Sequence, residues 1–350
     1  MSASPSRVAQ ISHFIHEHFI KLLLACYLIA AVLPVPGLAI RDGSAGTVKL
    51  LGEVVKLSCP LLMLSFLLFN AGFGIKASQL KGLKEHPATL IGGMAVNILA
   101  PILFILTLYP LTKGWHSQDE IQNILVGLSL IASMPIAGSS TAWSQNANGN
   151  LALSVGLVLL STLLSPIATP LALHTVSFLT TGDYAEDLKE IATSGTKLFL
   201  TICVIAPVIL GLIGRKLLGE TRVAAIAPVL KLCNSIVLLT LIYSNSAISL
   251  PQVLKNPDWD FLLLILLITG TLCASMFATG YWLSKLCKVN DADRTSLMFA
   301  LGMSNNGTGL VLAATALSDH PDVLLAIIAY NLIQHLVAGL VDQKFCRQPQ

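Results

Sequence analysis

The sequence predicts an all-α polytopic membrane protein, with ten transmembrane helices arranged as two inverted five-helix repeats. Composition is the first observation, because 54% of the 350 residues are hydrophobic and only 11% are charged. Charged residues also leave long gaps, with none between Glu120 and Asp183 or between Arg294 and Asp319. Such runs exceed the ~20 apolar residues that cross a bilayer. The third observation is that two apolar segments, in corresponding positions of the two halves, are interrupted by small and polar residues.

Ten apolar spans follow one another, mostly joined by short loops. They lie at about 19–40, 54–75, 88–111, 121–145, 151–180, 195–214, 223–246, 260–286, 293–317 and 321–343. The longest polar connection, Thr181 to Thr196, separates an N-terminal half, 1–180, from a C-terminal half, 181–350. Each half holds an odd number of spans, so we predict that the halves are inverted and intertwined in one transmembrane unit.

The basic residues predict the orientation of the chain. Of the 21 Lys and Arg residues, 13 lie on the side of the N-terminus and six on the opposite side, and the other two, Lys56 and Lys231, lie near span ends. Those six are Arg41, Lys49, Lys113, Lys189, Lys197 and Lys255. Because basic loops stay inside the cell, both termini are predicted to be cytoplasmic in a multi-pass protein of the cell (inner) membrane. The net charge of +3 reflects these loops. The predicted surroundings are therefore a lipid bilayer, with no nucleic acid and no readable protein partner.

The ninth span contains Gly302-Met303-Ser304-Asn305-Asn306-Gly307-Thr308-Gly309. Its three glycines and two adjacent asparagines lower helix propensity where a helix must satisfy its own backbone groups. A helix-packing face would explain the glycines, because small residues let helices approach closely. It does not explain the Ser-Asn-Asn triplet. We therefore predict unwound backbone that lines a binding site, with Asn305, Asn306 and Thr308 as candidate substrate-binding residues.

The fourth span is interrupted in the same way, between Ser133 and Ala142. Pro135 has no amide donor, Gly138 loosens the turn, and hydroxyls follow at Ser139, Ser140 and Thr141. Two interrupted spans in corresponding positions of two halves indicate a transporter binding site near the membrane centre. Both interruptions are expected to lie close together there.

The other function classes fit the sequence less well. A channel calls for rings of charge or repeated carbonyl filters along a pore, whereas two interruptions indicate a single central site. An enzyme is not predicted, because the chain has no HExxH motif, no GxSxG elbow and no paired aspartates within spans. A non-transporting receptor would not need two broken spans. The seven cysteines are scattered without a CxxC pair, and no cofactor is predicted unless sodium serves as a coupling ion.

Several segments resemble the bile acid:sodium symporter family. The stretch from Asp293-Arg294 through Gly302-Met303-Ser304-Asn305 is similar to its ninth span. The fifth span of the family is similar to Gly149–Val155 together with Ser161–Pro166. Its sixth span is similar to Pro207–Gly211 together with Arg215-Lys216. The resemblance covers residues 20 to 343. It implies a panel domain and a core domain, broken fourth and ninth helices that cross near the midplane, and transport of an organic anion such as a small carboxylate or a bile-acid-like molecule.

The resemblance also implies sodium ligands. The family's Ser-Asn pair in the fourth helix reads Ser140-Thr141 here, its serine early in the fifth helix is Ser154, and its glutamine after Gly-Met is Ser304. A glutamine of the third helix corresponds to Asn97. These residues would supply oxygen ligands that carry no formal charge.

Two departures from the family pattern concern the same ions. A threonine of the fifth helix is replaced by Val158, and the glutamate that contacts both sodium ions is replaced by Ala300. Without a carboxylate, we expect coupling to at most one sodium ion.

The tenth span adds two candidates. Asn331 matches a substrate-facing asparagine of the family. His335 lies well inside the span, and an imidazole there can exchange protons near neutral pH. His335 is therefore a proton-coupling candidate for a proton-coupled transporter, with an uncoupled transporter as a further alternative. A neutral histidine bonded to a neighbouring helix is the structural interpretation that stays open.

Overall fold

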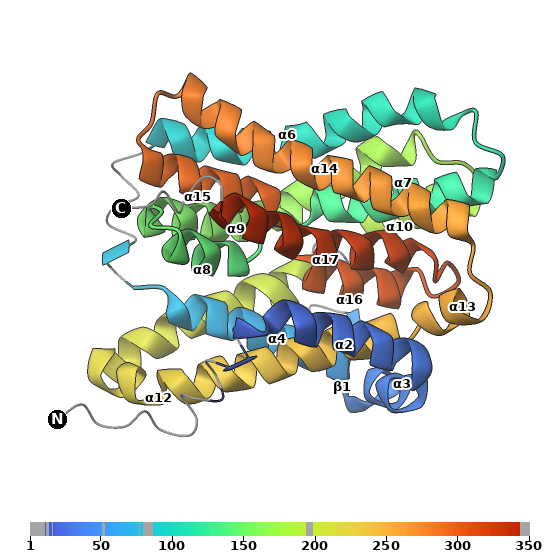
Figure 1. Cartoon of the computed structure of the whole chain (residues 1–350). Helices are drawn as coiled ribbons and strands as arrows, with labels where there is room; N and C mark the ends of the chain where they lie inside the picture. Colours follow the sequence, from blue (N-terminus) through green and yellow to red (C-terminus); the bar gives the residue numbers. More distant parts are fainter. Residues whose placement is uncertain are drawn as a thin grey trace. The chain divides into compact units, whose positions relative to one another are not determined.

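The computed structural model describes residues 11, 14–15, 17–50, 53–76, 78–79, 87–193 and 199–343, nearly all of them helical (Figure 1). The first four residues of the predicted sixth span, 195–198, and several basic residues of the charge count lie outside this part of the chain. The chain forms two compact units. Unit 1 comprises Met1–Gly74 and Ile202–Pro257, and unit 2 comprises Ile75–Thr201 and Asp258–Gln350. Each unit takes segments from both predicted halves, and the repeat division at residue 180 stays a prediction.

Unit 1 consists of apolar helices and one small hairpin. Its helices are α2 (Phe19–Val32), α3 (Pro34–Asp42), α4 (Cys59–Gly74), α12 (Ala206–Ser246) and α13 (Leu250–Lys255). Helices α2 and α3 meet at a bend of 93°, where Pro34 begins α3. A short π-helix, η2 (Leu200–Ile205), leads into α12. Residue Gly219, with φ +75°, kinks α12 between the predicted sixth and seventh spans.

The hairpin corrects the all-α prediction. Strands β1 (Ser44–Leu50) and β2 (Glu53–Ser58) pair antiparallel, and β2 occupies the residues where the second span was predicted to begin. The segment contains the β-branched residues Thr47, Val48, Val54 and Val55, which favour strands. Hydropathy alone could not separate a short apolar strand from the first turn of a helix.

Two glycines let α4 and α12 pack closely within unit 1. A Cβ built on Gly72 would lie 2.0 Å from the carbonyl oxygen of Val208, and one built on Gly211 would lie 2.1 Å from the carbonyl oxygen of Phe69. Beyond the crossing, the buried guanidinium of Arg215 donates to the Phe73 carbonyl oxygen at 3.0 Å and pairs with Glu220. Backbone-to-backbone contact therefore joins these two helices.

Unit 2 contains the remaining helices. They are α6 (Pro87–Thr112), α7 (Gln118–Ser133), α8 (Ser139–Asn146), α9 (Leu151–Ser177), α10 (Asp183–Thr193), α14 (Trp259–Leu286), α15 (Asp291–Gly302), α16 (Asn306–Ala316) and α17 (Val323–Val341). Several of these helices have an N-cap residue whose side-chain oxygen accepts a hydrogen bond from the first turn. Ser117 caps α7, Asn150 caps α9, Asp258 caps α14 and Asn290 caps α15.

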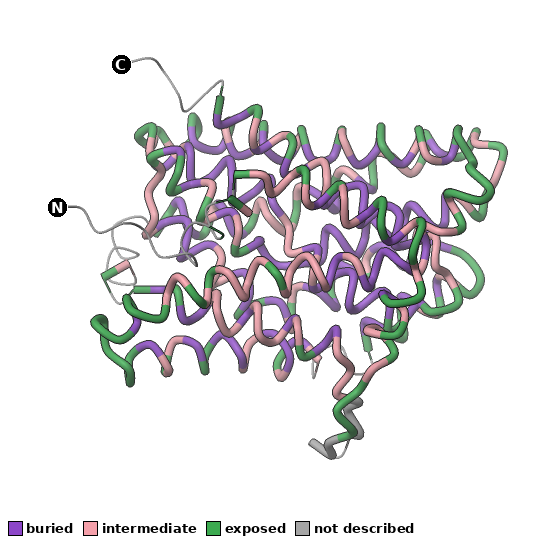
Figure 2. The backbone as a smooth tube through the Cα atoms, turned by 60° about the horizontal axis from the view of Figure 1, so that its bottom comes forward, coloured by how far each residue is buried: buried purple, intermediate pink, exposed green. Residues whose placement is uncertain are grey.

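The helices that precede the two breaks, α7 and α15, are the most buried elements of unit 2, and Figure 2 shows where buried backbone gathers. Every residue of α7 from Ile121 to Ser133 is buried, as is α15 from Thr295 to Gly302. Their neighbours α6, α9 and α14 instead expose large apolar side chains, including Leu103, Ile167 and Leu267. Helices that are apolar on both the packed and the exposed face indicate a lipid environment.

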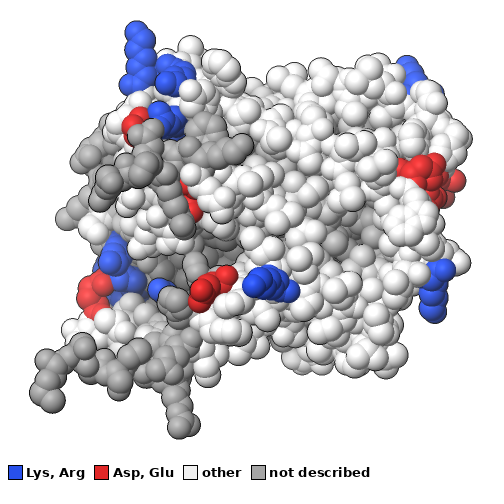
Figure 3. All heavy atoms as spheres, viewed as in Figure 1, with Lys and Arg blue, Asp and Glu red and all other residues white. Residues whose placement is uncertain are grey.

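Five helices are long and apolar enough to cross a membrane, or six if the bent pair α2–α3 counts as one span, among the residues described. On the face shown in Figure 3, most charged side chains lie toward the ends of the helices, and uncharged surface separates them. The chain is therefore a multi-pass membrane protein. Helices α7, α8, α15 and α16 are individually too short to span, because α7 and α15 end at a break and α8 and α16 begin after one.

The glycine crossing generates a prediction about stability. Gly211→Ala is expected to lower the free energy of unfolding by about 1–3 kcal/mol, because the new methyl group forces two backbones apart. Gly214→Ala is the matched control on the same helix, since its Cβ would meet ring atoms of Phe69 and Phe73 at an ordinary 3.6 Å. Thermal unfolding in detergent would measure both. Equal melting temperatures for the two variants would contradict the close crossing.

Candidate functional site

The break between α7 and α8, residues Met134 to Gly138, is held by α9. The Thr169 hydroxyl donates to the carbonyl oxygen of Ser133 at 2.6 Å, where α7 ends. The backbone N–H of Ile136 donates to the Ser161 hydroxyl oxygen at 3.0 Å. Pro135 brings no N–H that needs a partner. Side chains of α9 thus satisfy backbone groups that the interruption takes out of the helix.

The break between α15 and α16, residues Met303 to Asn305, is held by α17. The Ser304 backbone N–H donates to the side-chain oxygen of Gln334 at 3.0 Å. The buried Tyr330 hydroxyl donates to the Gly302 carbonyl oxygen at 3.3 Å. Asn305 uses its own side-chain oxygen to cap α16, accepting from the Thr308 N–H at 3.3 Å.

The two breaks pair with each other. Ile136 and Ser304 form an isolated antiparallel bridge. The Ala137 N–H donates to the Met303 carbonyl oxygen at 2.9 Å, and the Asn305 N–H donates to the Pro135 carbonyl oxygen at 2.8 Å. The expectation that both interruptions are non-helical and lie together is confirmed. Two short extended segments, buried inside unit 2, replace the helical hydrogen bonds that each chain gives up.

The residues predicted to hold sodium are brought together in part. The Ser154 hydroxyl of α9 lies 3.3 Å from the Thr141 hydroxyl of α8. Ser140 precedes Thr141 and is fully buried, and its hydroxyl has no hydrogen-bond partner among the described residues. Ser304 lies in the other break, at the bridge. These oxygens carry no formal charge, and the C-terminal ends of α7 and α15 lie at the two breaks.

The positions of the two family departures are consistent with this neutral site. Ala300 is buried in α15, two residues before that helix ends. The Val158 side chain has no oxygen, and its carbonyl oxygen already accepts the hydroxyls of Ser161 and Thr162. Neither position supplies a side-chain ligand.

Two of the residues predicted to bind substrate hold buried polar atoms without partners. Both side-chain polar atoms of Asn306 and the Thr308 hydroxyl make no hydrogen bond within the described part of the chain. Leaving such a group unpaired in a protein interior costs about 1–3 kcal/mol. Their place in the first turn of α16 adds the positive end of a helix dipole. This corner of the site therefore favours a polar or anionic ligand.

The predicted residues of the last helix lie beside the support of the break. Asn331 is buried, and its side-chain oxygen accepts from the Gln334 amide at 3.3 Å. His335 follows Gln334 and is also buried. Two hydrogen bonds, both made by the Gln334 side chain, thus connect Asn331 to the Ser304 backbone.

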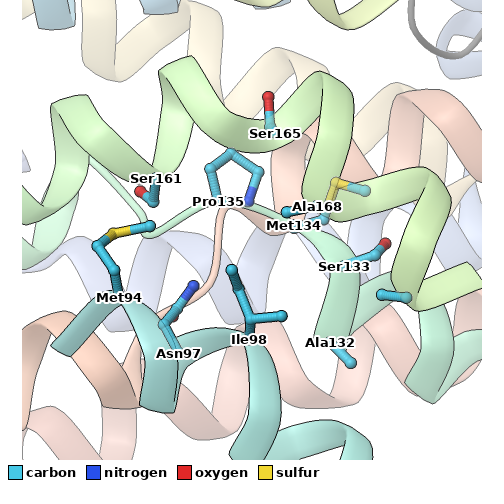
Figure 4. Close-up of a pocket in the computed structure, with 11 residues that line it drawn as sticks. Met94, Asn97, Ile98, Ala132, Ser133, Met134, Pro135, Ser161, Ser165 and Ala168 are labelled. Atoms are coloured by element: carbon cyan, nitrogen blue, oxygen red, sulfur yellow. The ribbon is translucent and has the colours of Figure 1, made fainter. Parts of the chain in front are cut away.

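A pocket lies at the α7–α8 break, where α6 and α9 approach it (Figure 4). Its cavity volume is about 10 Å³, roughly the space that one water molecule needs. Met94, Asn97 and Ile98 of α6 point toward Pro135, and Ser161 and Ser165 line the α9 side. Asn97, the counterpart of the family's third-helix glutamine, therefore faces the break.

Sequence reasoning did not identify the residues that support the breaks: Ser161, Thr169, Tyr330 and Gln334. A signal for them exists, because polar residues recur every four positions on one face of each helix, as at 161, 165 and 169 and again at 330 and 334. In an otherwise apolar helix, such a row indicates a polar neighbour. It does not reveal that the neighbour is a broken backbone.

Comparison with known proteins adds independent information. The model of the SBF-like CPA transporter family matches residues 17–347. A Bacillus subtilis protein named "Uncharacterized sodium-dependent transporter YocS" is 26% identical over 291 residues, covering 81% of this chain and 83% of that protein. Another Bacillus subtilis protein, named "Uncharacterized protein YbaS", is 25% identical over 285 residues, covering 79% of this chain and 85% of that protein. The rice "Probable sodium/metabolite cotransporter BASS2, chloroplastic" is 23% identical over 253 residues, covering 71% and 55%. The family and the functionally named relatives are transporters and not enzymes.

The paired breaks generate a crosslinking prediction. Ile136 and Ser304 form a non-hydrogen-bonded antiparallel pair, because the hydrogen bonds beside them are made by the flanking residues. In such a pair the Cα atoms lie about 4.5 Å apart, which is within disulfide reach. Ile136→Cys combined with Ser304→Cys, in a Cys273→Ala background, should therefore oxidise to a disulfide that peptide mass spectrometry detects. Each single variant is the control. A folded double variant that stays reduced would show that the breaks are not paired.

Proposed function

The chain belongs to the SBF-like CPA transporter family, and from this premise we propose that it is a secondary active transporter of a small organic anion, coupled to at most one sodium ion. The substrate class comprises small carboxylates and bile-acid-like molecules. The observation that carries the proposal is the pairing of two broken helices inside unit 2, with unpartnered polar groups at the start of α16.

The anion would be met by neutral donors. The N-terminus of α16 offers backbone N–H groups and a favourable dipole, which suit a carboxylate without any arginine. Asn305 and Asn306 supply amide donors there, Thr308 supplies a hydroxyl, and Asn331 approaches through Gln334. Such a site selects for a small negative group.

One sodium ion fits the remaining oxygens. Ser140, Thr141 and Ser154 lie together on α8 and α9, and Ser304 lies in the paired break. Helix ends that point their carbonyls into a break attract a cation. A second ion would need a charge that Ala300 does not provide. The names of two relatives, which include sodium, support this choice of ion.

The architecture proposed for transport is the ten-helix inverted repeat with broken fourth and ninth helices and alternating access. Each break is held by the next long helix after the interrupted span, which is α9 in one case and α17 in the other. A repeated structure would produce this correspondence. The count of basic residues supports an inner-membrane location with both termini in the cytoplasm.

Proton coupling is the alternative that a specific observation favours. His335 is buried in α17, directly after the residue that holds the α15–α16 break. Histidine is the side chain whose unperturbed pKa lies closest to neutral pH. Uptake into proteoliposomes, with the sodium and proton gradients varied separately, distinguishes the two couplings from an uncoupled transporter. A channel would instead pass the solute down its own concentration gradient, at a rate that neither the sodium gradient nor the proton gradient increases.

The substrate residue is tested with a pair of variants. Asn305→Ala removes both the cap acceptor and the amide donors, whereas Asn305→Asp keeps an oxygen for the cap. Both should weaken binding of the organic acid by about tenfold or more, because each loses the donors that an anion needs. The ligand is the acid that gives the largest thermal shift in a screen with and without sodium. Wild-type affinity in a folded Asn305→Asp protein would limit Asn305 to capping.

The missing carboxylate is tested by restoring it. Ala300→Glu should increase the dependence of uptake on sodium, because a charge at this position serves the ion directly. Ala300→Gln is the control of equal size without charge and should not do so. Sodium titration of uptake gives the apparent affinity and the Hill slope. A Hill slope near two in the unmodified protein would contradict coupling to at most one ion.

A further inference from the structure

Polar side chains form a buried seam at the end of unit 2 where α15 begins, and the proposed site does not use it. We define the seam as Ser144 of α8, Asn150 at the start of α9, and Asp293 and Ser296 of α15. The Ser144 and Ser296 hydroxyls lie 2.7 Å apart. The Ser296 hydroxyl also donates to the Asn150 carbonyl oxygen at 2.8 Å. The Asn150 amide donates to an Asp293 carboxylate oxygen at 2.7 Å.

The seam is built into the fold. Ser144 and Ser296 are fully buried, and Asp293 is 1% exposed. A Cβ on Gly149 would lie 2.3 Å from the Ser144 hydroxyl oxygen and 2.9 Å from that of Ser296, so this glycine leaves room for the hydroxyl pair. Asn150 is fixed at both ends, because its side-chain oxygen caps α9 while its amide holds Asp293.

The seam continues to the candidate sodium site along the same helix faces. Ser140 lies one helical turn before Ser144 on α8, and its buried hydroxyl has no partner among the described residues. On α9, Ser154 lies one turn after Asn150, and its N–H donates to the Asn150 carbonyl oxygen at 3.0 Å. On α15, Ala300 lies two turns after Asp293. Each of the three helices therefore links the seam to the breaks.

Asp293 supplies the charge that the breaks lack. No acidic residue occurs in α8 or α9, and the other acidic residue of α15, Asp291, is largely exposed and paired with Arg294 at 2.8 Å. A sodium ion that leaves the hydroxyls near the breaks needs further oxygen ligands to replace its water. Ser144, Ser296 and the Asp293 carboxylate offer them in succession.

We propose that this seam is the path by which the coupling sodium ion passes between the paired breaks and the end of unit 2 where α15 begins, with Asp293 as its charged ligand. The inference rests on the sodium coupling of the proposed function. It adds a cation site at Asp293 that is separate from the site at Ser140, Thr141 and Ser154.

The test compares Asp293→Asn with Asp291→Asn, two carboxylates of the same first turn that differ in burial. Purified variants are melted in sodium chloride and in choline chloride, and sodium-driven uptake is measured in proteoliposomes. Asp293→Asn should raise the half-saturating sodium concentration by about tenfold or more, because it removes the charge of the path. Asp291→Asn should keep the wild-type value. Ser144→Ala, which leaves the Asp293 contacts in place, should shift the sodium requirement in the same direction.

A purely structural role of Asp293 would lower the melting temperature equally in both salts and leave the sodium requirement unchanged, which would overturn the inference. The same result in a well-folded Ser144→Ala protein would overturn it independently of any loss of folding in Asp293→Asn. If the wild-type protein transports without any response to sodium, the proposed coupling fails, and the inference fails with it. A sodium response in the wild type that Asp293→Asn and Ser144→Ala both retain rejects the seam alone.

Discussion

The need to satisfy backbone groups away from water governs the structure around the site. A break in a helix within a bilayer releases carbonyl and amide groups that hydrocarbon cannot pair. Unit 2 solves this by placing two breaks against each other, so that Ala137 and Met303, and Asn305 and Pro135, exchange hydrogen bonds. Hydroxyl and amide side chains of α9 and α17 take up further groups. The two interruptions satisfy each other, and each would leave buried backbone groups unpaired without the other.

Electrostatics then decides what the site can hold. The N-terminal ends of α8 and α16 favour an anion, while the C-terminal ends of α7 and α15 favour a cation, so each break presents both kinds of helix end. Neutral side chains line both places. An anionic substrate and one sodium ion would compensate each other there, which couples their binding without a protein carboxylate. The buried Asp293 lies outside this pair of places, at the other end of α15.

The sequence was sufficient to predict the breaks and their proximity, because Pro135 and the Ser304-Asn305-Asn306 triplet contradict the apolar helices that surround them. It was not sufficient to predict the β-hairpin, since a short apolar run suits a strand and the start of a spanning helix equally. It also left the supports unassigned. A residue such as Gln334 announces a polar contact, but the identity of its partner depends on the helix packing, which periodicity does not contain. Asp293 lies at the edge of a predicted span, and its hydrogen bond to Asn150, a residue far away in sequence, cannot be predicted from that position.

The candidate residues all belong to unit 2, and this limits how the protein can change access to its site. Moving the two breaks apart to open the site would break at least two backbone hydrogen bonds in a dry interior. Each group left unpaired would cost about 1–3 kcal/mol. Breaking the bonds to Ser161 and Gln334 would add to that cost. A transporter that cycles many times gains by keeping such contacts closed. We therefore expect the two breaks to stay hydrogen-bonded to each other while ligands enter and leave along the helices that support them.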